Sequence, residues 1–448
     1  MKRIVSLFFI TLSFFVSTSV LAQIPLLPHI YAADPSAHSW DNDPETIWIY
    51  ASTDQPGTNT HKTMNGYHVY STKDMVNWID YGRVLAVEDV SWASTMAWAA
   101  DAVYWNEKYY LVYCMKERAT GTTRTGLAVS EVPQGPFEDI GYVNGVEFGQ
   151  DPALFIDNDT PYLFWGAGQK AHAAQLTNDL KSIIPKTFVD LTPQLFEVFE
   201  GPWVHKYQGI YYLSYPALPN GTWPEHLYYA TADHPLGPYT FQSEYIGFFE
   251  NHGNTNHGSI IPWKDKWIAF HHSAHLSGGN STARNLLADW LTYSENGEIN
   301  PIVQPKGLGL AEKSSVTIFL EAENAPKQGG KLDGTFVELT TPNYSGTGYV
   351  TGFETDYNFV EVLVQVAKDM TANLTIRMDI PKNVKADVFV GQKVLDLTWS
   401  GQVFKKTNGW EDIEFGEVVL TAGDNMIKIW AYQDVDLKVD WFKIVPAL

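Results

Sequence analysis

Three acidic residues in the N-terminal half of the chain have types and surroundings suited to acid–base chemistry. Asp34 and Asp151 each stand before a proline, and Glu200 opens the sequence Glu-Gly-Pro-Trp. Each is followed by an apolar, aromatic-rich run that is typical of a buried strand. Proline disfavours the helical conformation of the residue before it, so we expect both aspartates to be extended and their carboxylates to be held in a fixed direction.

Carboxylates gathered at one place favour the hydrolysis of glycosidic bonds. That reaction needs a carboxylic acid that protonates the leaving oxygen and a carboxylate that activates water or attacks the sugar. A third carboxylate can raise the pKa of the acid by like-charge repulsion. Trp40, Trp98 and Trp203 lie near these positions and offer flat faces for sugar rings. Acidic residues at strand starts are often turn formers, so the pattern alone leaves that interpretation open.

A repeat of short strands would bring these residues together. Its lead residues are separated by 67, 50, 49 and 57 positions, and each precedes an aromatic-rich hairpin: Asp34, Asp101, Asp151, Glu200 and His257. A second pair of strands follows in each unit. Five units of four strands are typical of a five-bladed β-propeller, with the first strand of each blade facing the axis. We expect the lead residues to lie around one end of the central channel. A β-sandwich array with accidental spacing is the alternative.

The sequence changes character after about residue 310, which predicts a second domain. Residues 307–315 read as a linker, and short alternating strands such as 360–366 follow. Short strands with polar turns over this length favour a β-sandwich of the jelly-roll kind. The predicted fold class is therefore all-β, with a signal peptide at 1–22, a five-bladed β-propeller catalytic domain at 23–312 and a β-sandwich at 313–448.

The N-terminus and the charge restrict the compartment and the partners. A basic start, an apolar run at 4–20 and a small residue at Ala22 indicate a secretory signal peptide, with a membrane anchor as the alternative. There is no Cys at the cleavage site for a lipid anchor, so we expect a secreted or periplasmic monomer. Its net charge of −21 disfavours nucleic acid and anionic membranes but not a neutral oligo- or polysaccharide. The one cysteine, Cys114, leaves no disulfide within the chain.

Six motifs in the propeller region carry a resemblance to a known family. In chain order they are Ala33-Asp-Pro35, Trp98-Ala-Ala-Asp101, Gly149-Gln-Asp-Pro-Ala-Leu-Phe155, Phe199-Glu-Gly-Pro-Trp203, His257-Gly-Ser259 and Arg284. Together they resemble glycoside hydrolase family 43, five-bladed propellers that act on arabinose- and xylose-containing glycans with inversion. One departure is Ala100, where the family usually has proline. The resemblance implies a hydrolase that needs no cofactor for its chemistry.

The resemblance also implies a role for each carboxylate. Asp34 corresponds to the general base that activates water, and Glu200 corresponds to the general acid. Asp151 corresponds to the carboxylate that orients the acid and modulates its pKa. In an inverting enzyme the base and the acid are expected about 6.5 to 9.5 Å apart.

Further residues are implied to bind the sugar or an ion. Arg284 resembles the arginine near the acid and the sugar, and Trp98 resembles a tryptophan that lines the sugar pocket. His38 and Trp203 are additional candidates for contact with the sugar. His257 resembles the central-channel histidine of the family, which often sits beside a bound calcium, so we expect it to contact such an ion through water. Asp101 is expected to be structural.

The C-terminal region resembles a family 6 carbohydrate-binding module in three motifs: Leu320-Glu-Ala-Glu-Asn324, Ser345-Gly-Thr-Gly-Tyr-Val350 and Val439-Asp-Trp-Phe442. The resemblance implies a structural calcium with hard oxygen ligands: Glu321, Glu323 and Asp440. Tyr349 and Trp410 are the candidate aromatics of a sugar cleft. Lys438 stands where the family has an asparagine, so a packing domain without sugar binding is the alternative.

The combined expectation is an exported, inverting exo-glycosidase of plant-type polysaccharides, with α-L-arabinofuranosidase activity as the first hypothesis. The polar segments 53–61 and 276–280 could wall off a pocket, which favours exo action. A β-xylosidase is the second hypothesis, followed by a β-galactofuranosidase or exo-galactanase. An inactive glycan-binding propeller belongs to a different class, and the presence of all three carboxylates argues against it.

Overall fold

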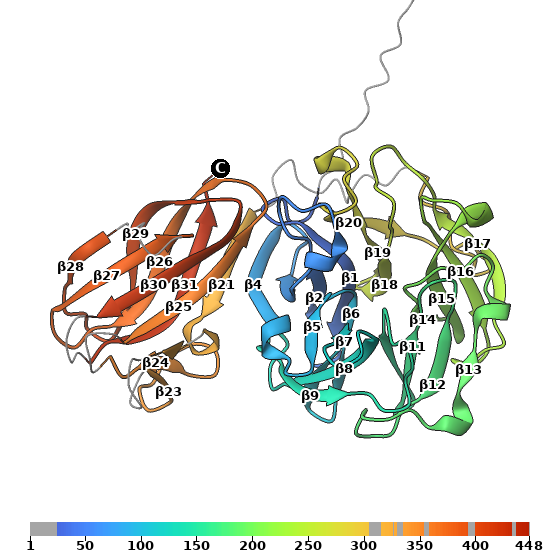
Figure 1. Ribbon diagram of the computed structural model, residues 1–448, viewed down its shortest axis with the longest axis horizontal. Coiled ribbons are helices and arrows are strands. Elements are labelled where there is room, and N and C mark those ends of the chain that lie inside the picture. The colour runs from blue at the N-terminus through green and yellow to red at the C-terminus, as the bar shows by residue number, and fades with distance from the viewer. Residues whose placement is uncertain are drawn as a thin grey trace, which may run out of the picture.

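The computed structural model describes residues 25–303, 315–325, 327–328, 335–353, 358–392, 399–431 and 436–447. The predicted signal peptide at 1–22 lies outside the described residues. The fold is all-β, with a five-bladed β-propeller followed by a β-sandwich (Figure 1). In the described part of the chain, no helix is both long and apolar enough to span a membrane.

Five antiparallel sheets form the blades of the propeller. The first blade contains β1 (Ala32–Trp40), β2 (Asp43–Thr53), β3 (Gly66–Thr72) and β4 (Asn77–Ala86). The second contains β5 (Ala93–Thr95), β6 (Ala100–Trp105), β7 (Lys108–Glu117), β8 (Thr123–Ser130) and β9 (Glu138–Tyr142). The third contains β10 (Ala153–Asp157), β11 (Thr160–Trp165), β12 (His172–Gln175) and β13 (Val189–Asp190). The fourth contains β14 (Trp203–Tyr207), β15 (Ile210–Ala217), β16 (His226–Ala232) and β17 (Thr240–Ile246), and the fifth contains β18 (Gly258–Trp263), β19 (Lys266–Ser273) and β20 (Asn285–Leu291).

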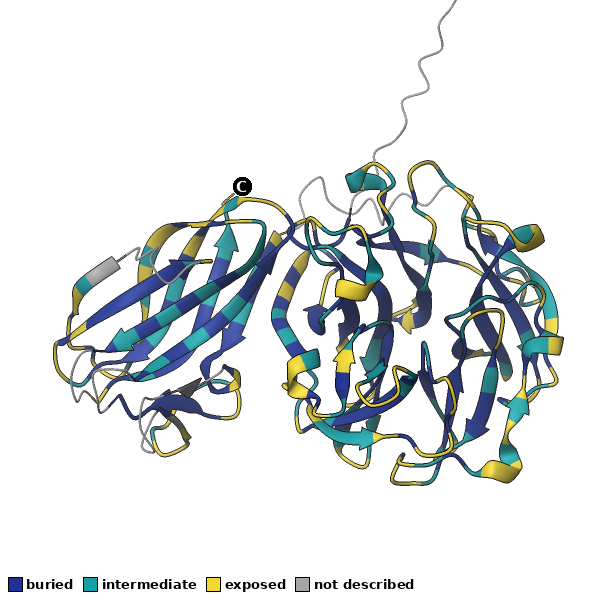
Figure 2. Ribbon diagram, viewed as in Figure 1, coloured by how far each residue is buried: buried dark blue, intermediate teal, exposed yellow. Residues whose placement is uncertain are grey.

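The apolar core of the propeller is divided among five clusters, each between two neighbouring blades. Between the first and last blades, for example, Ile49 of β2 belongs to one cluster with Ile268 of β19. Side chains alternate across each strand, so a blade covered on both faces must be apolar on both faces. The inner strands are accordingly buried along most of their length (Figure 2). This packing fixes the strand ends from which the lead residues project.

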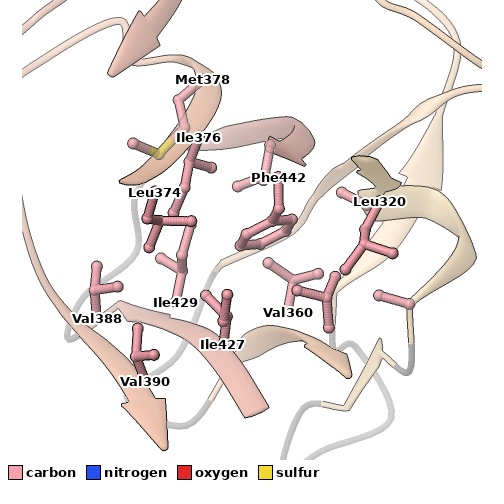
Figure 3. Close-up of a cluster of buried hydrophobic side chains, with 14 of the residues drawn as sticks. Leu320, Val360, Leu374, Ile376, Met378, Val388, Val390, Ile427, Ile429 and Phe442 are labelled. Carbon is pink, nitrogen blue, oxygen red and sulfur yellow. The ribbon is translucent and has the colours of Figure 1, made fainter. Parts of the chain in front are cut away.

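The β-sandwich packs two sheets around one apolar cluster (Figure 3). One sheet contains β21 (Ser315–Glu321), β23 (Phe336–Glu338), β24 (Tyr349–Thr351), β26 (Met370–Asp379), β29 (Trp410–Leu420) and β31 (Lys438–Pro446). The other contains β22 (Lys327–Gln328), β25 (Phe359–Val366), β27 (Val384–Gly391), β28 (Trp399–Phe404) and β30 (Gly423–Ala431). Ile376 and Phe442 from the first sheet face Val360 and Ile427 from the second (Figure 3).

The two domains share a sheet. Strand β21 pairs in parallel with β4, from Ser315 opposite Asn77 to Ile318 opposite Asp80. The first blade and one sheet of the sandwich therefore form a continuous ten-stranded sheet. Gly82 lies so close to Leu320 that a Cβ on the glycine would be 2.5 Å from the leucine Cδ2. The sequence predicted two domains in series but gave no sign of this shared edge.

Candidate active site

The three predicted catalytic carboxylates line one cavity of about 200 Å³. Asp34 lies on β1, Asp151 lies just before β10, and Glu200 lies just before β14. All five blades contribute to the lining, which consists of Asp34, His61, Met64, Trp98, Ala99, Gln150, Asp151, Glu200, Trp223, Thr255, His257 and Arg284. The inner strands of the blades thus bring together side chains that are far apart in sequence.

Both Asp-Pro aspartates adopt a conformation that the sequence did not predict. We expected an extended backbone, but φ is 56° at Asp34 and 48° at Asp151. Positive φ is uncommon outside glycine, and aspartate is one of the residues that tolerate it. Both carboxyl groups are buried, with 7% and 4% of the residue exposed. Proline disfavours the helical region for the aspartate but allows a positive φ, and at Asp34 the register of β1 with β2 shifts between Ala33 and Ser36.

Asp34 is surrounded by groups that stabilise its ionised form. Arg284 Nη1 lies 3.3 Å from Asp34 Oδ1, and the Ser52 hydroxyl donates to Asp34 Oδ2 at 2.5 Å. The backbone N–H of Asp34 donates to His272 Nδ1 at 3.1 Å. Burial acts to raise the pKa of Asp34, but Arg284, followed by His272, His257 and Ser52, outweighs it and holds the pKa well below its usual range. Asp34 is therefore a carboxylate at any pH near neutrality.

Glu200 has the opposite electrostatic environment. Its side chain is half-buried at the cavity wall, and burial and the charge of Asp34 raise the pKa of Glu200 to about 7. Arg284 opposes this shift without cancelling it. The nearest side-chain donor is Gln150 Nε2, at 3.5 Å from Glu200 Oε2. A glutamic acid that keeps its proton up to about pH 7 can act as a general acid.

Asp151 is the third carboxyl group of the cavity, and its pKa is raised. Burial, then the charges of Glu200 and Asp34, raise the pKa of Asp151 well above its usual value. Hydrogen bonds from the Gln150 side chain and the Gly201 backbone partly oppose this shift. The bond from Gly201 links Asp151 to the residue that follows Glu200. Asp151 thereby contacts the backbone next to Glu200, whereas the charge that raises the pKa of Glu200 is that of Asp34.

Arg284 is held by an acidic residue that the sequence did not single out. Asp54, which is 1% exposed, accepts from Arg284 Nε at 3.0 Å and from Arg284 Nη2 at 2.9 Å. The backbone N–H of Arg284 also donates to Asp54 Oδ2 at 2.9 Å. This bidentate pairing fixes the guanidinium plane so that Nη1 points to Asp34. Asp54 lies at the start of the polar segment predicted to form a pocket wall.

The remaining predicted binding residues divide into two groups. Trp98 and His257 line the cavity, as does Arg284. His38 and Trp203 do not belong to the lining. His38 lies four residues beyond Asp34 on β1, where Nε2 is 2.8 Å from Asp101 Oδ1 and the ring stacks on Trp40 at 4.4 Å. Trp203 is 7% exposed and donates to the carbonyl of Ile260. The centres of the two rings lie 5.3 Å apart, and the rings pack against each other outside the cavity lining.

Sequence reasoning missed Trp223, which lines the cavity, and the buried Glu225, which lies outside the lining. Trp223 lines the cavity, is 49% exposed and packs edge-on against Phe199, beside Glu200. Glu225 is fully buried and accepts from the backbone N–H of Asn256 at 2.7 Å. A Trp-Pro pair in a polar loop is the only sequence signal for Trp223, and nothing near Glu225 in sequence distinguishes it from a surface residue.

The predicted ion ligands of the β-sandwich come together. The Ser345 hydroxyl donates to Glu321 Oε2 at 2.7 Å and to Asp440 Oδ1 at 3.2 Å, and the Thr347 N–H donates to Glu323 Oε1 at 2.7 Å. Burial and the neighbouring carboxylates raise the pKa of Glu321 to about 8, and burial and Asp440 raise that of Glu323 to about 7. Among the described residues, no group of three or more His, Cys, Asp or Glu side chains has the arrangement of a metal site.

The predicted sugar cleft of the β-sandwich is not an open platform. Tyr349 is fully buried, and its hydroxyl donates to Glu338 Oε2 at 2.7 Å. Trp410 packs edge-on against Tyr349, with ring centres 5.3 Å apart. Lys438 Nζ pairs with Asp379 Oδ2 at 3.1 Å. These contacts occupy the groups expected to receive a sugar.

Comparison with known families identifies the catalytic domain. Residues 23–299 match the family described as Glycosyl hydrolases family 43. The chain belongs to glycosyl hydrolase family 43. It is therefore a glycoside hydrolase whose propeller carries the candidate carboxylates at one cavity.

Several relatives of this family 43 chain match it over nearly their whole length. A protein from Bacteroides ovatus named "Xylosidase/arabinosidase" is 31% identical over 61% of this chain and 95% of its own length. "Xylosidase/arabinosidase 43A" from Humicola insolens is 32% identical over 61% of this chain and 98% of its own. A β-xylosidase/α-arabinofuranosidase from a compost microbial metagenome, solved in complex with xylotriose, has a TM-score of 0.56 at 30% identity and covers 63% of this chain and 97% of its own.

The family assignment of the C-terminal domain is corrected by the same comparison. Residues 321–442 match carbohydrate binding module family 35, not family 6. The two are near relatives, and the motifs at Glu321 and Asp440 did not separate them. The chain therefore has a carbohydrate-binding module on the C-terminal side of its family 43 propeller, as predicted.

Proposed function

We propose that this family 43 enzyme is an inverting exo-glycosidase that removes a terminal pentose from a plant-type polysaccharide. The observation that carries the proposal is the pairing of an ionised Asp34 with a protonated Glu200 in one small cavity lined by all five blades. A general base and a general acid on the same sugar are what inversion requires. A small cavity lined by all five blades favours the end of a chain over its middle.

Each carboxylate has a distinct part in the proposed reaction. Asp34 takes a proton from water, whose oxygen attacks the anomeric carbon as the glycosidic bond breaks. Glu200 gives its proton to the departing glycosidic oxygen, so the leaving group departs as an alcohol. Asp151 accepts from the backbone of Gly201 and so positions the residue that follows Glu200. Glycosidases of this family need no cofactor for this chemistry.

The sugar is proposed as α-L-arabinofuranose first and β-D-xylose second. The names of the Bacteroides ovatus and Humicola insolens relatives contain both activities, and the metagenomic enzyme was solved with xylotriose. Trp98 lines the cavity and offers a flat face to a pentose ring, while Trp223 at the mouth is placed to meet the leaving group. Either pentose fits this description.

A panel of nitrophenyl glycosides tests the proposal. The α-L-arabinofuranoside, the β-D-xyloside and the β-D-galactofuranoside are compared at equal concentration, together with intact arabinoxylan. We expect release of one or both pentoses, and proton NMR of the first-formed sugar should show the inverted anomer. Retention of configuration, or cleavage inside the polysaccharide before any free pentose is seen, would contradict the proposal.

We propose further that calcium stabilises the protein at two places. In the propeller, Glu225 Oε1 and Asn256 Oδ1 are buried without partners beside His257, which suits a hard cation that His257 contacts through water. In the sandwich, Glu321 and Glu323 flank Gly346, and the Ser345 hydroxyl brings Glu321 together with Asp440. The residues fit calcium at both places, because each place gathers carboxylate or amide oxygens, the ligands that calcium prefers.

Removal of calcium should destabilise the folded protein. We expect dialysis against EDTA to lower the Tm by at least about 3 °C, because an ion that binds only the folded state stabilises it by mass action. Differential scanning calorimetry with and without millimolar calcium measures the effect. Glu321→Gln and Glu225→Gln should each lose part of the calcium response, whereas Glu411→Gln, at an exposed position, should keep all of it. An identical Tm in EDTA and calcium would rule out both sites.

We also infer that the protein is exported, because of its N-terminal sequence, and that it is a monomer. The basic start and the apolar run at 4–20 support cleavage after Ala22. Mass spectrometry of the mature protein should give a chain that begins at Gln23, and size-exclusion chromatography should give the mass of one chain. A protein that keeps residues 1–22 would contradict the inference.

A further inference from the structure

A hydrogen-bonded chain of amides crosses from the C-terminal domain to the wall of the catalytic cavity. Gln365, on β25 of the sandwich, is 3% exposed and donates from Nε2 to Gln55 Oε1 at 2.9 Å. Gln55 in turn donates from Nε2 to Asn65 Oδ1 at 2.8 Å. The interacting residues Gln365 and Gln55 are 310 positions apart in sequence.

Gln55 and Asn65 stand at the two ends of one loop, so their hydrogen bond closes its base. This segment, residues 54–65, is called the wall loop below. His61 and Met64 of the wall loop line the cavity. The wall loop contacts the second and fifth blades at its far end, where Trp98 donates to the carbonyl of His61 at 2.9 Å and Thr282 donates to the carbonyl of Thr58 at 2.9 Å.

The base of the wall loop also adjoins the catalytic base. Asp54, next to Gln55, makes the bidentate contact that aims Arg284 at Asp34. A shift of the loop base would therefore move the residues of the wall loop that line the cavity and would change the orientation of Arg284. The Gln55 side-chain oxygen accepts from Gln365, which lies outside the propeller.

The contacts around Gln365 hold the sandwich in a fixed place. The backbone N–H of Ala367 donates to the carbonyl of His29 at 2.7 Å, and Arg83 Nη2 lies 3.1 Å from Asp424 Oδ1. The parallel pairing of β21 with β4 lies beside them (Figure 1). With the backbone anchored on both sides, the Gln365 amide has a defined position relative to the wall loop.

We propose that Gln365 is a positioning residue for the substrate cavity and that the β-sandwich acts as a buttress of the wall loop. The proposal rests on the glycosidase activity of the site but goes beyond it, because it assigns the C-terminal domain a role in catalysis that needs no sugar bound to that domain. Gln365 acts through Gln55 and touches no substrate.

Gln365→Met tests the proposal, because methionine keeps the length of the side chain and removes the donor. We expect KM for a pentoside to rise about three- to tenfold with kcat within about twofold, since the wall loop binds the sugar in both ground and transition states. Gln392→Met is the matched control, because Gln392 is an exposed glutamine of the same domain that donates to the carbonyls of Thr421 and Ala422. It should leave both constants unchanged.

A double-mutant cycle with Gln55→Met separates positioning from general stability. If Gln365 acts through Gln55, the double variant should be no worse than Gln55→Met alone. Hydrogen–deuterium exchange should be faster in peptides covering residues 54–65 of Gln365→Met and unchanged in Gln392→Met. Additive losses, or wild-type KM and exchange in Gln365→Met, would overturn the proposal.

The exchange measurement needs no substrate, so the two proposals fail in different ways. If the wild-type protein hydrolyses no glycoside, the proposed function is wrong. Hydrogen–deuterium exchange in residues 54–65 still tests whether Gln365 positions the wall loop. If the wild type is active but Gln365→Met behaves like the wild type in both measurements, the proposed role of Gln365 is wrong and the proposed function is unaffected.

Discussion

Glu200→Gln should lose roughly 10²- to 10⁴-fold in kcat/KM on an unactivated oligosaccharide, the range contributed by a general acid. The amide keeps the size of the side chain but cannot give a proton to the departing oxygen. On a dinitrophenyl pentoside the loss should be much smaller, because that leaving group departs as a stable anion without protonation. Steady-state kinetics on the two substrates measure the difference, and affinity for the free pentose should be unchanged.

The pH dependence of the wild type checks the same assignment. The pKa of Glu200 is raised to about 7, so the acid is protonated and active below that pH and is lost as the pH rises through it. The alkaline decline should be absent when Glu200→Gln acts on the dinitrophenyl substrate. Glu250→Gln, at an exposed position, is the control and should behave as wild type. Full activity of Glu200→Gln on the oligosaccharide would show that another group is the acid.

Asp34→Asn should lose roughly 10²- to 10⁴-fold in kcat/KM on both the oligosaccharide and the dinitrophenyl substrate. Activation of water is needed whatever the leaving group, so a better leaving group cannot compensate for a missing base. The ratio of the two losses therefore distinguishes the base from the acid. Asp41→Asn is the matched control, since Asp41 is exposed on the turn between β1 and β2.

The Asp34 variant also has a stability signature. Asp34 lies beside the buried Arg284, and asparagine would leave the guanidinium without that charge while keeping its pairing with Asp54. We expect the Tm to fall without loss of folding, as read by circular dichroism. A variant that retains more than a tenth of wild-type activity on both substrates would show that Asp34 is not the base.

The residues that sequence reasoning placed well are those tied to the repeat. Asp34, Asp151, Glu200 and His257 each start a blade, so a regular spacing and the geometry of a propeller were enough to predict their convergence. Their protonation states needed the structure. Whether the pKa of each carboxyl group is raised or lowered depends on Arg284. This residue contacts Asp34 but is 250 positions away in sequence.

Positions set by long-range pairing could not be predicted. Asp54 is defined by its partner Arg284, 230 positions later, and its own neighbours in sequence are ordinary loop residues. His38 was expected to contact the sugar, but the structure places its Nε2 2.8 Å from Asp101 Oδ1, outside the cavity lining. The positive φ of the two aspartates also had no signal in the sequence, because the rule for a residue before proline favours an extended backbone.

The shared sheet has a consequence for solubility. An outer blade strand with unpaired N–H and C=O groups can add a strand from another molecule, and proteins usually protect such edges. In this chain β21 occupies the edge of β4, where Ile79 is 37% exposed and the register with Thr317 is fixed. The sandwich thus shields the first blade from intermolecular pairing. A propeller expressed without it would present a bare edge strand and should aggregate more readily than the full chain.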